Sequence, residues 1–142
     1  MLGFVPQPNR VFGSVHSFNG GIVVDDTLVF LDRYSGAIWK NLPRKQLAVR
    51  AGTRVRDVVK ALLEEGLAFA AQPSHDAQSI AGILSTDVHG TGKNRGFVSE
   101  SVVRLKVPHE NKVILDIASD PKFLPADDFK MPPFIKGICT PV

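Results

Sequence analysis

The chain has 142 residues, 44% hydrophobic and 22% charged, a composition that predicts one globular domain with a core of its own. The chain has 17 basic and 14 acidic side chains, and the basic ones are scattered without a long run, so a nucleic-acid-binding face is not indicated. Its single cysteine, Cys139, excludes an internal disulfide and a multi-cysteine zinc site. No apolar run approaches the roughly 18 residues of a membrane span and no signal peptide is evident, so we expect a cytoplasmic protein without nucleic-acid or membrane partners.

Short strands are predicted throughout the first third of the chain. They are rich in β-branched and apolar residues and are bounded by glycine, aspartate or asparagine. The expected strands span residues 11–13, 22–24, 27–31, 37–40 and 46–51.

An amphipathic helix is predicted after Gly52, with Thr53 as its N-cap and Gly66 at its end. Its apolar residues recur at helical spacing: Val55, Val58, Val59, Leu62 and Leu63. Its charged residues are expected on the opposite, solvated face: Arg54, Arg56, Asp57, Lys60, Glu64 and Glu65. We interpret this helix as one that packs against a sheet and carries no chemistry.

The second half of the chain adds a short helix that begins near Asp76 or Ser79 and continues through Leu84. Two alternating segments, residues 102–107 and 112–117, are predicted to form a hairpin with its turn at 108–111. A strand-rich chain with two short helices favours an α+β fold. We assign it to residues 1–118, because five of the ten prolines lie in 119–142 and argue against a central strand there.

Two loops carry the residues that a phosphate-bearing cofactor needs. Residues 72–92 concentrate glycines, hydroxyls and small side chains, and residues 13–19 do so again near the start of the chain. Small side chains let the backbone approach a ligand closely, and free N–H groups and hydroxyls supply donors. The pair of loops predicts one ligand held from two sides.

Three other kinds of site are rejected. Gly90-Thr91-Gly92 is followed by Gly96, a spacing that does not fit the dinucleotide-binding motif, and Lys93 is followed by Asn94, which does not fit the P-loop. The histidines are spread along the chain without a carboxylate at helical spacing, so no metal site is expected.

The loop Gly13-Ser14-Val15-His16-Ser17-Phe18-Asn19 resembles the G-[ST]-x-H-S-F-[NS] loop of flavin oxidoreductases in the vanillyl-alcohol oxidase superfamily, closest to the alditol oxidase and sugar-lactone oxidase branch. Residues 48–66, 79–92 and 102–117 are similar, in the same order, to the family's strand–turn–helix unit, its second flavin-contacting segment and the hairpin that follows. The resemblance covers residues 10–120. Gly137-Ile138-Cys139-Thr140 is faintly similar to the glycine-rich return strand of the family's domain, so the alternative for the proline-rich segment 119–142 is a remnant of that strand.

The resemblance implies a PCMH-type FAD-binding domain, possessing the α+β fold, in which two small subdomains hold an extended FAD. It implies that His16 bonds covalently to the flavin. The further cofactor contacts that it implies are Gly13, Ser14, Ser17, Ser79, Gly82, Ser85, His89, Gly90 and Gly92. We expect Gly82, Gly90 and Gly92 to be glycine for close backbone approach or positive φ, and the Asp87 carboxylate to point away from the phosphates.

The implied function is the FAD-binding part of a flavin-dependent oxidoreductase that acts on CH–OH groups of polyols or sugar lactones. The alternative is a non-catalytic remnant or accessory protein with the same fold that binds no flavin by itself. The family's first strand–helix–strand unit and its substrate domain are expected outside this chain, which is then trimmed at both ends. We therefore assign no catalytic residue, and we expect the isolated chain to be inactive and prone to self-association.

Overall fold

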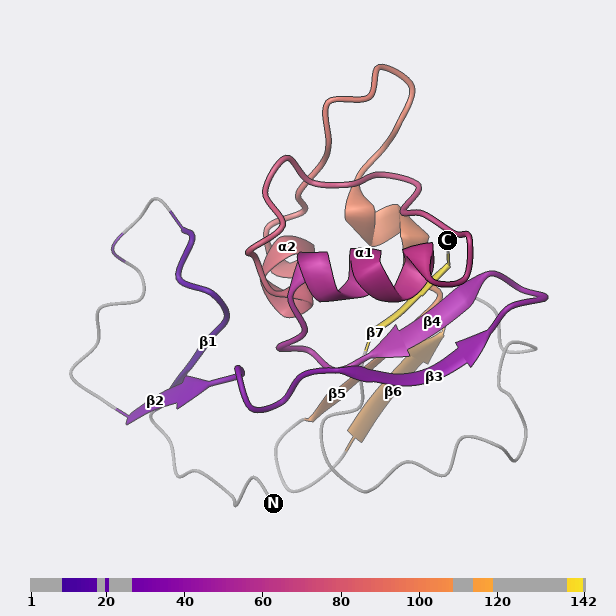
Figure 1. Cartoon of the computed structure of the whole chain (residues 1–142). Coiled ribbons are helices and arrows are strands. Elements are labelled where there is room, and N and C mark those ends of the chain that lie inside the picture. Colours follow the sequence, from indigo (N-terminus) through magenta and orange to yellow (C-terminus); the bar gives the residue numbers. More distant parts are fainter. Residues whose placement is uncertain (1–8, 18–19, 21–26, 109–113, 119–137, 142) are drawn as a thin grey trace.

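The computed structural model describes residues 9–17, 20, 27–108, 114–118 and 138–141 (Figure 1). The strands are β1 (Asn9–Phe12), β2 (Thr27–Phe30), β3 (Ala37–Asn41), β4 (Gln46–Val49), β5 (Arg104–Pro108), β6 (Ile114–Ala118) and β7 (Ile138–Pro141). The helices are α1 (Val55–Leu63), α2 (Ile80–Ser85) and the 3-10 helix η1 (Val98–Ser101). This mixture of strands and short helices confirms the predicted α+β class. The expected strand at 22–24 and turn residues 109–111 lie outside the described residues.

Most strands belong to one antiparallel sheet with the order β3-β4-β7-β5-β6. β5 and β6 pair as the predicted hairpin. β1 and β2 form a separate two-stranded parallel sheet, which lies beside the larger one in Figure 1. The two sheets are connected through the turn that follows β2.

The central position of β7 contradicts the expectation that the density of prolines excludes a central strand from residues 119–142, whereas the alternative, that this segment is a remnant of the domain's return strand, stays a prediction. The four residues of β7 pair with β4 on one side, and two of them, Ile138 and Cys139, pair with β5 on the other. The physical reason is the place of the prolines: four of the five precede the strand, and Pro141 occupies its last position, opposite Gln46. A missing N–H at the end of a strand leaves the rest of the ladder intact.

The core lies between β4 and the helices, with α1 over the face of β4 in Figure 1. Its buried members are Leu47, Val49, Val55, Val58, Leu62, Ile80, Ile83 and Val98. Leu63, which we expected on the apolar face of α1, is instead 64% exposed, because it lies at the edge of the apolar stripe in the last turn. Within the described residues no helix is long and apolar enough to cross a membrane.

The start of α1 differs from the prediction. Arg54 is the N-cap and makes no side-chain capping bond, whereas the Thr53 hydroxyl donates to Arg50 O (2.7 Å) and accepts from Gly36 N (2.9 Å). The first N–H groups of the helix donate to carbonyls of the segment before α2, so a side-chain cap is not needed there. The helix ends as predicted, because Gly66 adopts φ +70° beyond its last turn.

Candidate cofactor-binding site

The first predicted loop begins where β1 ends. Gly13 and Ser14 are half-buried, whereas Val15, His16 and Ser17 are exposed. Val15 has φ 58°, a left-handed conformation that a β-branched residue adopts only when its surroundings impose it. Phe18 and Asn19 lie outside the described residues.

The backbone of this loop has donors to offer. No hydrogen bond to the rest of the described chain engages the N–H groups of residues 14–17, the two hydroxyls or the His16 ring. Successive N–H groups around a left-handed residue form a concave donor set that suits an anion. This is the donor chemistry that a phosphate-bearing cofactor requires.

The loop lies directly against the N-terminus of α2. A Cβ added to Gly13 would be 2.2 Å from Ser79 Oγ and 4.0 Å from Gly82 Cα, so a side chain at residue 13 would require the buried Ser79 hydroxyl to move. The structure thereby brings together three predicted site residues, Gly13, Ser79 and Gly82, from the two loops.

The first turn of α2 is already bonded within the protein. Ser79 is 2% exposed and its Oγ accepts from Gly82 N (3.3 Å), while Ile80 N donates to Thr53 O and Ala81 N to Ala51 O. A phosphate placed here would therefore draw its donors from residues 14–17. Ser79 packs against Gly13 of the loop 13–17, and a direct contact of Ser79 with a cofactor stays a prediction.

The remaining predicted residues follow α2 along the chain. The exposed Ser85 hydroxyl donates to Ala81 O, one turn earlier (2.8 Å). His89 is exposed, with Nδ1 2.8 Å from Gly90 O and its ring edge-to-face with Phe97 at 5.8 Å. Asp87, at φ 51°, accepts a hydrogen bond from the Ser99 hydroxyl, which directs its carboxylate to η1.

The expectation for Gly82, Gly90 and Gly92 is partly wrong, because none of them has a positive φ. The close approach at Gly90 is to the protein's own backbone: an added Cβ would lie 2.3 Å from Gln72 O. At Gly92 an added Cβ would meet the Arg95 side chain, 2.8 Å from Cγ. Gly90 therefore has a structural reason to be glycine, whatever ligand binds nearby.

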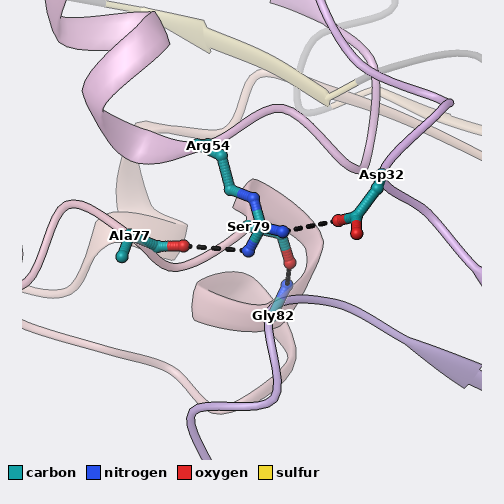
Figure 2. A network of polar contacts seen from close by, with 5 residues as sticks. All are labelled: Asp32, Arg54, Ala77, Ser79 and Gly82. Carbon is teal, nitrogen blue, oxygen red and sulfur yellow. Dashed lines mark hydrogen bonds and ion pairs between the residues drawn. The ribbon is translucent and has the colours of Figure 1, made fainter.

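Arg54 does not belong to the solvated face on which we placed it. Its Nη1 donates to Ala77 O (3.0 Å) and its Nη2 pairs with Asp32 Oδ1 (2.5 Å), as Figure 2 shows. Helical periodicity cannot reveal such a contact, because Asp32 and Ala77 are 22 and 23 residues away in the sequence. Gly52 was missed for the same reason: an added Cβ would lie 1.9 Å from Leu31 O.

Comparison with known proteins identifies the family. The family described as "FAD binding domain" matches residues 6–116, most of the chain and all of the candidate site. The chain belongs to this family. This family and the shared fold confirm the predicted FAD-binding domain of PCMH type.

The curated relatives include sugar-lactone enzymes. D-arabinono-1,4-lactone oxidase of Yarrowia lipolytica is 32% identical over 114 residues, which cover 78% of this chain and 22% of that protein. Mitochondrial L-galactono-1,4-lactone dehydrogenase 1 of Oryza sativa subsp. japonica is 31% identical over 114 residues, which cover 79% and 20%. This chain therefore spans about a fifth of the length of these relatives.

Solved structures share the fold. Cholesterol oxidase from B. sterolicum superposes with a TM-score of 0.67 at 18% identity, covering 93% of this chain and 29% of that one. Alkyldihydroxyacetonephosphate synthase gives a TM-score of 0.66 at 15% identity, covering 79% and 22%.

The residues present fit the family's cofactor. The N–H groups of 14–17 offer donors to a pyrophosphate, Gly13 lets this loop lie directly against Ser79, and the Asp87 carboxylate is engaged by Ser99. Within the described part of the chain, no cluster of three His, Cys, Asp or Glu side chains could hold a metal ion.

Proposed function

We propose that this chain is the FAD-binding part of a flavin-dependent oxidoreductase that acts on CH–OH groups of sugar lactones, with polyols as the second substrate class. The names of the lactone oxidase and dehydrogenase relatives support the substrate class. The observation that carries FAD binding is the row of N–H groups of residues 14–17, which have no hydrogen-bond acceptor within the described residues and lie beside the N-terminus of α2. FAD, when bound, supplies the hydride acceptor.

The residues of the chain hold and orient the cofactor in this proposal. The N–H groups of 14–17 and the Ser14 and Ser17 hydroxyls bind the phosphates. Gly13 and Gly82 keep the loop 13–17 and the N-terminus of α2, the two walls of the site, close enough to contact one ligand. Ser85, His89, Gly90 and Gly92 continue the cofactor-facing surface beyond α2. The groups that bind the substrate are assigned to no residue of this chain, so we expect the isolated chain to bind FAD without turnover.

We further propose that His16 forms a covalent bond to the flavin ring. Its ring is exposed, has no hydrogen bond within the described chain, and follows Val15, whose left-handed conformation fixes the direction of the loop. A covalent tether retains the cofactor and raises its potential as an electron acceptor.

Acid precipitation of the flavin-loaded protein tests the covalent bond. We expect flavin absorbance to remain with the precipitated wild-type chain and to be lost in His16→Ala, which still binds FAD reversibly because the phosphate donors are unchanged. His75→Ala is the matched control, since His75 is exposed and is not among the predicted cofactor contacts. Wild-type protein that binds FAD and releases all of it in acid would contradict the assignment of His16.

One observation favours the alternative of a non-catalytic relative that binds no flavin by itself: the first-turn N–H groups of α2 are already occupied by Thr53 O, Ala51 O and Ser79 Oγ. A purified chain that retains no flavin after incubation with excess FAD and removal of the free FAD would support this alternative. The cytoplasmic location stays a prediction of the sequence.

A further inference from the structure

The turn after β2, the turn before α1 and the segment before α2 meet in one place, although they are far apart in the sequence. Gly52 N donates to Tyr34 O (2.9 Å), which joins the first two segments. Val55 N donates to Gln78 O (2.9 Å), and Arg54 forms an isolated β-bridge with Ser79, which join the last two. Arg54 lies at this junction.

The Arg54 side chain joins the same segments a second time. One arm of its guanidinium donates to Ala77 O and the other pairs with Asp32, with the side chain 23% exposed (Figure 2). A guanidinium can hold both partners at once because its donors are fixed in a planar fork, whereas an ammonium is a single point charge.

Both partners of Arg54 lead to the two walls of the candidate site. Asp32 follows Leu31, whose N–H donates to Phe12 O (3.2 Å), and Phe12 directly precedes the loop 13–17. Ala77 lies two residues before Ser79, on which Gly13 packs. The Asp32–Arg54–Ala77 bridge therefore joins the segment that supports the loop 13–17 to the segment that leads into the N-terminus of α2.

We propose that Arg54 is a positioning residue that fixes this separation and so sets the geometry of the FAD-binding site; the role toward FAD rests on the proposed function. The polar partners of the Arg54 side chain within the described residues are Ala77 and Asp32, and neither belongs to the loop 13–17. Arg54 acts through Asp32, which is continuous with the strand that β1 pairs with, and through Ala77, which leads into α2.

The test compares Arg54→Met and Arg54→Lys with Arg56→Met. The variant Arg56→Met removes the same charge two residues further along the chain, but the Arg56 side chain is exposed and makes no hydrogen bond or ion pair within the described residues. We expect Arg54→Met to weaken FAD binding about tenfold or more, because two charge-assisted bonds are lost, with little change for Arg56→Met. Arg54→Lys restores the charge without the fork, so it should leave most of the loss in place.

Two further readouts separate positioning from general instability. At saturating FAD, the visible circular dichroism of the bound flavin should change in Arg54→Met, which a mere loss of stability would not produce. In flavin-free protein, amide exchange of Ile80 and Ala81, whose N–H groups bond to Thr53 O and Ala51 O, should accelerate about tenfold in Arg54→Met and stay unchanged in Arg56→Met.

The outcomes are distinguishable. Unchanged exchange and unchanged FAD affinity in Arg54→Met would overturn the proposal, as would equal effects in Arg56→Met, which would indicate net charge alone. Full recovery in Arg54→Lys would overturn the requirement for the fork. If the wild-type chain binds no FAD, the proposed function fails, and the exchange measurement still decides whether Arg54 holds the two segments in place.

Discussion

At the scale of single residues, the glycines of the candidate site are distinguished by what surrounds them. Gly13 faces Ser79 across the two loops, so its lack of a side chain serves the junction at which a ligand is expected. Gly90 faces the Gln72 carbonyl and serves the fold. Two glycines in similar sequence contexts thus have different roles, and only the neighbouring atoms reveal the difference.

Gly90→Ala is predicted to destabilise the protein whether or not FAD is present. The added Cβ would lie 2.3 Å from Gln72 O, and backbone atoms cannot move aside as a side chain does. We expect the free energy of unfolding in urea to fall by about 1–3 kcal/mol, as for other overpacked sites. Gly20→Ala is the control, because nothing lies within 4 Å of its added Cβ. Equal stability of the two variants would contradict this explanation of Gly90.

Tyr34 provides a pH probe of the turn after β2. Burial raises the pKa of its phenol above the ordinary value of 10.0, an effect that the Arg50 guanidinium partly opposes. Because the pKa is higher in the folded state, the unfolded chain releases this proton first, so the contribution to stability is present below about pH 10 and is lost as the pH rises through the folded-state pKa.

Tyr34 is the only tyrosine, so the ultraviolet absorbance of its phenolate reports this one group. We expect a titration midpoint above 10.0 in the folded chain, returning to the ordinary value in denaturant. A midpoint below the ordinary value would mean that the charge of Arg50 outweighs burial.

At the scale of elements, α1 contributes one narrow face, Val55, Val58 and Leu62, to the core that it shares with β4. Leu62 is 2% exposed and belongs to the core, whereas the adjacent Leu63 is 64% exposed. The two leucines follow one another in the same turn, so they form a natural pair for measuring what burial contributes.

Leu62→Ala is expected to lower the free energy of unfolding by about 2–5 kcal/mol, since a buried side chain is lost and a cavity remains. Leu63→Ala should change it by less than about 0.5 kcal/mol, as at other surface positions. Urea unfolding with an unchanged m-value is the measurement. A comparable loss in Leu63→Ala would mean that its exposed face is covered in solution.

Much of the architecture could be predicted from hydrophobic periodicity, because the signal is local. The strands at β2 to β6, the helix α1 with its end at Gly66 and the capping of α2 by Ser79 follow from patterns within a few residues. The role of Thr53, the ion pair of Arg54 and the place of β7 depend on partners about 17 to 90 residues away, and no local pattern encodes them.

The candidate site divides in the same way. Residue types and order in the two loops were sufficient to predict the family, whereas the close packing of Gly13 on Ser79 was not predicted. The internal bonding of the first turn of α2 and the contact of Gly90 with Gln72 could not be predicted, because both are made by backbone atoms that every residue carries.

At the scale of the whole molecule, the parallel pair of β1 and β2 exposes several large apolar side chains. Val11 is 55%, Leu28 41% and Phe30 54% exposed, although Phe30 stacks on the buried Phe12 at 5.4 Å. Parallel strands are ordinarily covered on both faces, and a two-stranded sheet has little stability of its own. The self-association predicted from the sequence would use this surface, so ligand binding should be measured on monodisperse protein.

Equilibrium titration of FAD with the monodisperse chain tests the central claim most directly. The account predicts saturable binding of one FAD per chain, with quenched flavin fluorescence, and much weaker binding of riboflavin, which lacks the phosphates that residues 14–17 are proposed to hold. Equal affinity for FAD and riboflavin, or no change in flavin fluorescence at saturating protein, would contradict it.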